Sequence, residues 1–155
     1  MHQFKDKSGK VWQIAVTIGS AMAVKAALQI DLLQPEEGSP PLLTRLATDE
    51  LLLGSVICEL LRPQFEANKT TEAEVYAGFD GETLLAAQEA FFGDLKDFFQ
   101  ARGRLERATA VRRQGDLLAA GIKYAAGHLE EIAKAKLREI EKMTTDGFSS
   151  GALPG

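Results

Sequence analysis

Apolar and polar residues alternate along residues 9–18, GKVWQIAVTI, with the period of a half-buried β-strand. One side of this stretch collects its larger apolar residues, Trp12, Ile14, Val16 and Ile18. The loop DKSG separates it from Phe4, with Asp6 suited to the start of a turn and Gly9 to the positive φ that rejoins a strand. The pattern predicts a β-hairpin whose Trp12 side is buried.

After the hairpin, the apolar spacing becomes helical through the rest of the first two thirds of the chain. Helices are expected at residues 19–30, from 42 to about 48, and at 49–62, 74–79 and 82–99. Residues 30–41 contain three prolines and two glutamates and predict a surface loop, while Pro63 is expected to end the 49–62 helix. That helix is apolar over most of its circumference, so it is expected in the interior.

Polar residues at the expected helix starts can satisfy the free backbone N–H groups there. Ser20 can cap the 19–30 helix, and Thr48 or Asp49 can cap the helix that follows them. Thr71, with Glu74 three residues later, has the spacing of a capping box. These residues place the predicted starts of three helices.

Residues 104–143 are expected to form one long, charged helix. Its apolar residues step by 4, 3, 4 and 3 through Leu118, Ile122, Ala125, Leu129 and Ile132, and the spacing then drifts. This covers about two heptads, short of the three to four that define a coiled coil, and interior glycines weaken the helix further. The helix is therefore expected to gain stability by packing.

These elements predict a mainly α-helical α+β fold: a small N-terminal β-hairpin, a helical bundle and a long C-terminal helix. The expected division is a hairpin plus bundle over residues 1–101, a charged helix over 102–143 that packs on the bundle or on a partner, and a flexible tail over 144–155. A chain of 155 residues, 45% hydrophobic and 26% charged, can bury the core of one domain. It has neither a signal-peptide pattern nor an apolar run long enough for a bilayer, so we expect a cytoplasmic protein without membrane contact.

Charge is unevenly distributed along the chain, whose net charge is -4. Residues 1–101 carry 8 Lys+Arg against 15 Asp+Glu, whereas residues 102–155 carry 10 against 7. The basic part can therefore dock on the acidic body or on an acidic neighbour. It includes five arginines between 102 and 113, but these spread around a helix rather than along one face, and the pI is near 5.3. Nucleic-acid binding is accordingly not favoured.

Residues that could carry catalysis are sparse. His2 and His128 are far apart in the sequence and have no Cys or carboxylate at metal-ligand spacing. Asp94 and Asp97 share one face of a helix beside a lysine, where exposed ion pairing is the simpler interpretation. No phosphate-binding glycine loop is present, and the single Cys58 lies in an apolar run typical of a core. The sequence predicts no catalytic residues, no metal site and no cofactor, and hence a protein that is not an enzyme.

A two-stranded hairpin is marginally stable alone, so its Trp12 side is expected to lean on the helices. Its outer edge would still offer unpaired backbone groups, which can recruit a strand from another copy or from a client. Packing of the hairpin onto its own helices alone is the alternative. The candidate partner-binding residues are Trp12, Ile14 and Val16 in the hairpin and Leu118, Ile122, Leu129 and Ile132 on the long helix.

Four motifs, in this order, resemble a known family. They are F-x-D-x-x-G-x-x-W-x-I-x-V at residues 4–16, Ile30-Asp31-Leu32-Leu33, Leu46-x-x-Asp49-x-x-Leu52 leading to Pro63, and Leu95-x-Asp97-Phe98-Phe99. Over about residues 3–100, the chain resembles small proteins encoded among the tail genes of tailed phages and prophages, often treated as tail assembly chaperones or tail accessory proteins.

The resemblance implies a non-enzymatic helical protein that binds the long tape-measure protein in the host cytoplasm. Such a protein would shield the hydrophobic helices of its client before the tail tube polymerises, and would then be displaced. Whether it forms a homo-oligomer is left open. Two alternatives remain: a structural virion component, such as a tail or head-tail connector subunit, and a small regulatory protein that binds nucleic acid through residues 102–113.

Overall fold

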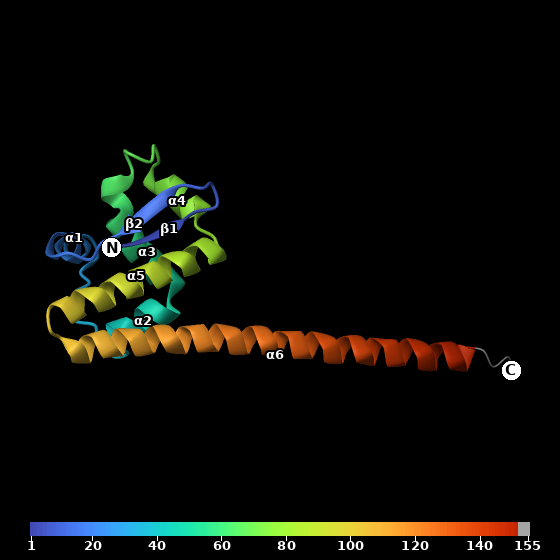
Figure 1. Cartoon of the computed structure of the whole chain (residues 1–155). Coiled ribbons are helices and arrows are strands. Elements are labelled where there is room, and N and C mark those ends of the chain that lie inside the picture. The colour runs from blue at the N-terminus through green and yellow to red at the C-terminus, as the bar shows by residue number, and fades with distance from the viewer. Residues whose placement is uncertain (152–155) are drawn as a thin grey trace. The chain divides into compact units, whose positions relative to one another are not determined.

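The computed structural model describes the backbone of residues 1–151 and the side chains of residues 1–144. The chain divides into a compact first unit, Met1–Asp116, and a second unit, Leu117–Gly155. In chain order its elements are β1 (His2–Lys5), β2 (Val11–Ile14), α1 (Ile18–Leu28), α2 (Leu42–Thr48), α3 (Glu50–Leu61), the short 3₁₀ helix η1 (Arg62–Gln64), α4 (Glu72–Gly78), α5 (Gly81–Ala101) and α6 (Leu105–Gly151) (Figure 1). The predicted fold class, α+β with an N-terminal hairpin and a long C-terminal helix, is confirmed.

The hairpin forms as its alternating pattern predicts. β1 and β2 are antiparallel, with Phe4 opposite Trp12. In the loop between them, Oδ1 of Asp6 accepts hydrogen bonds from the N–H groups of Ser8 at 2.9 Å and Lys10 at 3.0 Å. Gly9 has a φ of 84°, the left-handed conformation that glycine adopts without steric cost. The loop is thus fixed by local side-chain chemistry that the sequence already displays.

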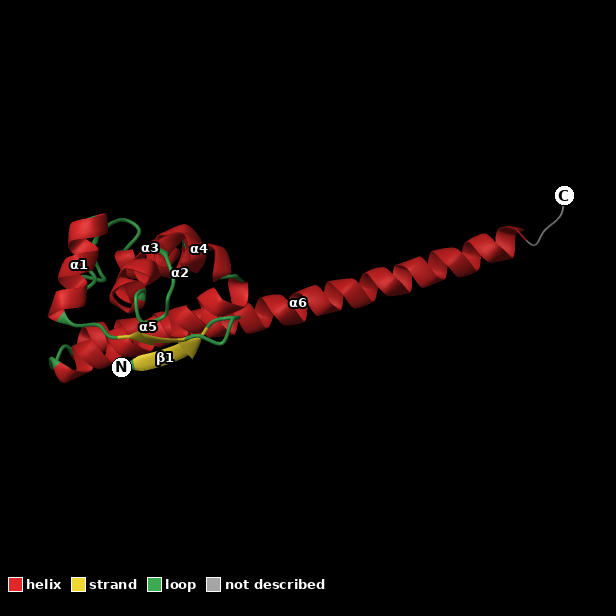
Figure 2. Cartoon of the chain, turned by 90° about the horizontal axis from the view of Figure 1, so that it is seen from above, coloured by secondary structure: helices red, strands yellow, loops and turns green. Residues whose placement is uncertain are grey.

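The core of the first unit forms between this hairpin and the helices. Trp12 meets Phe65 and Phe79 edge to face, with ring centroids 6.2 and 6.3 Å apart. Phe79 also packs edge to face on Phe4, at 5.8 Å. Figure 2 shows the strands running beside α5, whose Phe91 is fully buried. The buried aromatic side of the N-terminal hairpin therefore forms part of the core.

α5 and β1 approach each other closely because α5 carries a glycine where they touch. A Cβ atom at Gly93 would lie 2.8 Å from Nε2 of His2. Real Cβ atoms do not come that close to another heavy atom, so the His2 ring occupies the space that a larger residue would fill. This contact places the start of β1 next to the carboxylates of Asp94 and Asp97, which follow Gly93 on α5.

Helix caps agree with the sequence in two places and differ in one. Asp49 caps α3 by accepting from the N–H of Leu52 at 3.1 Å, and Thr71 caps α4 by accepting from the N–H of Glu74 at 3.3 Å. The predicted capping box at Thr71 forms only by this half, because the Glu74 carboxylate accepts from the hydroxyl of Thr70 at 3.0 Å. The prediction that Ser20 caps the first helix is wrong. Thr17 is its N-cap, and Ser20 completes the capping box from the third helical position.

The structure changes three further expectations about boundaries. Ile18 begins α1 and is 58% exposed, so it does not continue the buried side of the strand. The first unit extends to Asp116, rather than to 101, because Ala108 and Val111 of α6 are buried. α6 continues through Gly151, so residues 144–151 of the expected tail are helical, and residues 152–155 lie outside the described part of the chain.

Candidate protein-interaction surface

The hairpin side chains that sequence reasoning assigned to partner binding lie in the interior. Trp12, Ile14 and Val16 are 1%, 0% and 6% exposed. They point to the same side as Phe4 and pack on the helices, which was the alternative left open by the sequence. Their assignment as partner-contact residues is therefore corrected: they are core residues, because the hairpin buries its only large apolar side.

The outer edge of β2 is also covered. The N–H of Gln13 donates to Oε1 of Gln64 at 2.9 Å, and Nε2 of Gln64 donates to the carbonyl of Gln13 at 2.7 Å. Two residues after Gln13, the carbonyl of Ala15 accepts a hydrogen bond from the hydroxyl of Ser20 at 2.9 Å. A glutamine side chain thus pairs with β2 as another strand would, which is one way in which proteins protect a sheet edge.

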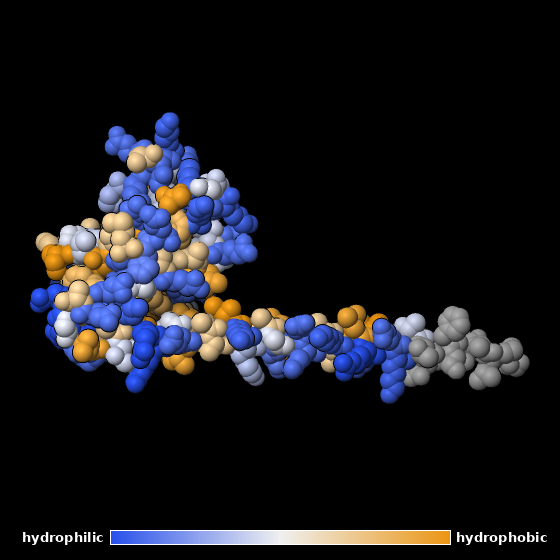
Figure 3. All heavy atoms as spheres, viewed as in Figure 1, coloured by the Kyte–Doolittle hydropathy of each residue, from blue (hydrophilic) through white to orange (hydrophobic). Residues whose placement is uncertain are grey.

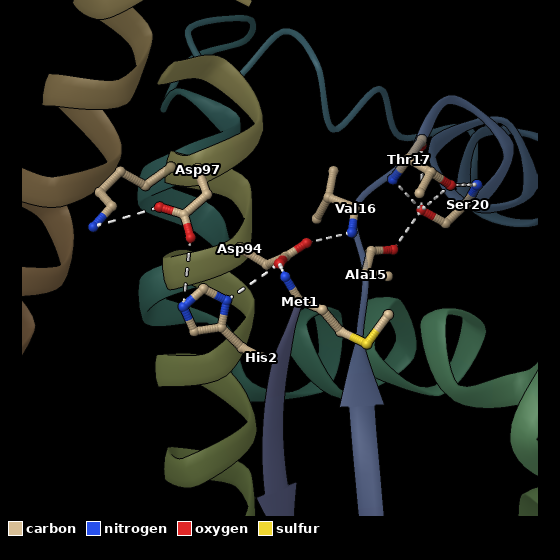
Figure 4. Close-up of polar contacts among 9 residues, drawn as sticks. Met1, His2, Ala15, Val16, Thr17, Ser20, Asp94 and Asp97 are labelled. Atoms are coloured by element: carbon tan, nitrogen blue, oxygen red, sulfur yellow. Dashed lines mark hydrogen bonds and ion pairs between the residues drawn. The ribbon is translucent and has the colours of Figure 1, made fainter. Parts of the chain in front are cut away.

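A buried carboxylate fastens the far end of the hairpin to α5 (Figure 4). Asp94 is 5% exposed and accepts a hydrogen bond from the N–H of Val16. Its other oxygen lies 2.7 Å from the ammonium of Met1 and 3.2 Å from Nδ1 of His2. Asp97, one turn further along, is half exposed, with Oδ2 3.7 Å from Nε2 of His2. The prediction that Asp94 is exposed is therefore wrong, because its ion pair with Met1 lies in the interior, whereas Asp97 does lie at the surface.

The electrostatics of this cluster follow from its contacts. Burial raises the pKa of Asp94, but hydrogen bonds from the Met1 ammonium, the Val16 N–H and His2, together with the charge of the ammonium, outweigh it and leave the pKa below its ordinary value. Its hydrogen bond to Asp94 and the negative charge of that carboxylate in turn raise the pKa of the Met1 ammonium. The cluster is a structural ion pair whose polar groups are already engaged with each other.

The second unit presents the candidate residues on its helix. Ile122, Leu129 and Ile132 are 46%, 65% and 49% exposed, and Leu118 is half-buried. Further along the same helix, Leu137, Ile140 and Met143 are also exposed. Figure 3 shows apolar residues interspersed with charged ones along this segment. We call the set Leu118, Ile122, Leu129, Ile132, Ile140 and Met143 the apolar stripe.

At about 100° per residue, members of the apolar stripe fall within about 60° of Leu129 around the helix. Leu117 and Tyr124 fall more than about 100° away, on the other side of the helix. Tyr124 is 73% exposed there, and its ring stacks on His128 at 5.8 Å. His128 is thus a surface residue with an aromatic neighbour.

The arginine-rich segment is partly used inside the first unit. Arg107 donates to the carbonyl of Leu33 at 2.8 Å and to Glu36 at 2.6 Å, and its guanidinium lies 5.8 Å from the centre of the Phe99 ring. Arg104 pairs with Glu106 at 2.9 Å. These two arginines therefore hold the start of α6 in place, and the segment does not offer all its charges on one face.

Among the side chains of residues 1–144, no three of the types His, Cys, Asp or Glu come together in a way that could hold a metal ion. Cys58 is buried, and burial raises the pKa of its thiol, which keeps it in the less reactive protonated form. None of the described helices combines the length and apolar character needed to cross a bilayer.

Two hollows open on the first unit. One, of about 390 Å³, lies between the hairpin loop and α4, where Lys7 pairs with Asp80 at 2.6 Å. The other, of about 430 Å³, is lined by α2 and the loop before it, and there the Nε of Arg45 is buried without a hydrogen-bond partner. Neither hollow contains a histidine or a cysteine among its lining residues.

Comparison with known proteins adds no relative: no family model, no curated protein and no solved structure matches the chain. The resemblance to tail assembly chaperones therefore stays a prediction. The apolar stripe is the surface on which a function can be argued from the structure.

Sequence reasoning missed two residues that hold the hairpin in place, Gln64 and Asp94. Gln64 was not singled out, because a glutamine after a helix carries no signal of the strand it will cover. Asp94 had one usable signal, its position on the apolar side of α5 one residue before the core Leu95. A charged residue at such a position requires partners from another element, and these come from the hairpin.

Proposed function

We propose that this chain is a non-enzymatic phage tail assembly protein that acts as a chaperone and binds an α-helical client, the tape-measure protein, through the apolar stripe. The client follows from the motifs in residues 4–99 that resemble tail assembly chaperones. The mode of binding follows from the physical character of the second unit.

The observation that carries the proposal is the exposure of large apolar side chains along the second unit. Scattered apolar residues are normal on a protein surface, but contiguous apolar patches mark interaction sites. Residues three and four apart on a helix are neighbours, so Ile122, Leu129 and Ile132 adjoin each other through Ala125 and Ala126. An amphipathic client helix can lay its own apolar side along such a surface.

The stability of the second unit supports the same interpretation. Gly121 and Gly127 each cost up to about 1 kcal/mol relative to alanine in a helix interior. Isolated helices derive little stability from propensity alone and usually depend on tertiary packing of an apolar side. A helix of this composition therefore gains from a partner that covers it.

Capture of a tape-measure fragment encoded beside this chain tests the proposal. The double variant Ile122→Asp with Leu129→Asp places two charges in the stripe and is expected to weaken capture about tenfold or more, since burying an unpaired carboxylate is costly. The matched control, Leu117→Asp with Tyr124→Asp, adds the same charge on the other side of the helix and should capture as the wild type does. Equal capture by wild type and the stripe variant would remove the helix from the mechanism.

A further inference from the structure

The apolar stripe has an internal period of 11 residues. Leu118, Leu129 and Ile140 follow one another at this interval, and Ile122, Ala133 and Thr144 follow each of them by four residues. Eleven residues make about three helical turns at about 3.67 residues per turn, so the stripe stays on one side of a nearly straight helix. This period accounts for the drift away from the heptad spacing after Ile132.

The charges around the stripe are balanced. Residues 117–144 carry 5 Lys+Arg and 4 Asp+Glu. Two copies of this segment therefore meet without a large net repulsion, unlike two copies of the acidic residues 1–101. The charge balance favours a second copy of the same helix over a strongly charged partner.

One charged residue, Lys136, lies within the stripe, 18 residues after Leu118 and so on the same side of the helix. In a parallel pair of helices, Lys136 would face its own copy. In an antiparallel pair centred near Glu131, it faces Ala126 of the second copy, and Glu130 lies one turn beyond that alanine. The antiparallel arrangement thus keeps the two lysines apart and sets each against an alanine, while Glu130 pairs with Lys134 of its own helix at 3.5 Å.

The same register matches the apolar residues. It places Ile122 opposite Ile140 and Leu129 opposite Ala133, while Ile132 falls opposite Glu130 at the edge of the stripe. From Leu118 to Met143 the stripe is about 38 Å long, at 1.5 Å per residue. Specific protein interfaces bury about 1,200 Å² in total or more, so a stable dimer requires the stripe to be covered along most of this length.

We propose that residues 118–143 of two copies pair antiparallel through the apolar stripe, so that the protein without a client is a dimer. This inference does not depend on the identity of a client. A dimer would cover the surface that a client helix needs, and the client would have to displace the second copy.

Analytical ultracentrifugation of the purified full chain tests the pairing, over about 1–200 µM protein. The wild type is expected to shift from monomer to dimer in this range. Leu129→Asp with Ile140→Asp should weaken the dimer about tenfold or more, while Leu117→Asp with Tyr124→Asp should leave it unchanged. A wild type that stays monomeric throughout, or a stripe variant that dimerises as the wild type does, would overturn the proposal.

Cysteine cross-linking tests the orientation, with Ile122→Cys and Ile140→Cys made as separate variants that retain the buried Cys58. Oxidation of their mixture is expected to give mainly the mixed 122–140 disulfide. Disulfides formed mainly between two copies of the same variant, or no cross-link in a mixture that sediments as a dimer, would contradict the antiparallel register. No client is present in either experiment, so failure of this proposal is distinct from failure of client binding.

Discussion

Replacing Asp94 by asparagine tests whether the buried carboxylate holds the hairpin to α5. Asparagine has nearly the same shape, but it is neutral, and only one of its two polar atoms accepts hydrogen bonds. The wild-type carboxylate uses one oxygen for the N–H of Val16 and the other for the Met1 ammonium and His2. The variant therefore has to leave one of these groups without an acceptor.

The magnitude can be worked from these contacts. The side chain of Met1 is 57% exposed, so water can solvate the ammonium once its contact with residue 94 is lost. Losing that contact alone therefore costs little stability. If the amide oxygen turns to the chain terminus instead, the Val16 N–H stays buried and unpaired, which costs about 1–3 kcal/mol. With the loss of a hydrogen bond to a charged acceptor, we expect the free energy of unfolding to fall by about 2–3 kcal/mol.

Urea unfolding followed by the fluorescence of Trp12, the only tryptophan, measures this change in the first unit. Asp97→Asn is the matched control: its side chain is 50% exposed, and it is expected to change the stability by less than about 0.5 kcal/mol. A loss of stability for Asp94→Asn that is no larger than for Asp97→Asn would refute the structural role of the carboxylate.

The effect should also depend on pH in one direction. The pKa of Asp94 lies below the ordinary value of 3.8 in the folded protein, so the folded state favours the ionised form. Its contribution to stability is therefore fully present above the unfolded pKa and is lost as the pH falls through the folded pKa. The difference between wild type and Asp94→Asn should shrink below about pH 4, and a difference that grows on acidification would contradict the assignment.

Three further predictions concern other parts of the chain. Gln64→Ala removes both hydrogen bonds to Gln13 and should lower the free energy of unfolding, measured in urea, by about 1–2 kcal/mol. Amide hydrogen exchange at Gln13 should become faster, and unchanged exchange would mean that this side chain does not protect the strand edge. Gly121 and Gly127 have open space around them, so the double variant Gly121→Ala with Gly127→Ala should stabilise the helix by up to about 1 kcal/mol per site. The helical signal in the far-ultraviolet circular dichroism spectrum should rise, whereas a fall would indicate a partner packed against the glycines. Cys58 should react with a thiol reagent at pH 8 only after unfolding, and rapid reaction of the native protein would contradict its burial.

The parts of the fold that follow from local chemistry were predictable from the sequence. The hairpin has its alternation, its turn aspartate and its glycine in one stretch of 15 residues, 2–16. Asp49 and Thr71 precede the helices that they cap, so each lies beside the N–H groups that it satisfies. In such cases the residues that determine the structure are neighbours in the chain.

The parts that failed depend on contacts between distant segments. Asp94 lies on the apolar side of α5, but the groups that satisfy its carboxylate, on Met1, His2 and Val16, belong to a distant segment and leave no sign in the pattern of the helix. The start of α6 offers just Ala108 and Val111 as buried apolar residues, too few to show that it belongs to the first unit. For the stripe, the sequence identified the residues correctly as one side of a helix, but it could not show how exposed they are.

The two attachments of β2 have a kinetic consequence. Gln64, after α3, holds the strand at Gln13, and Asp94, on α5, holds the chain at Val16. Residues of two helices from separate parts of the chain thus bind β2 and the segment after it, so β2 does not fray as the strands of a terminal hairpin usually do. The amide hydrogen of Gln13 should therefore exchange with solvent mainly when the whole unit opens, so that it reports on global rather than local unfolding.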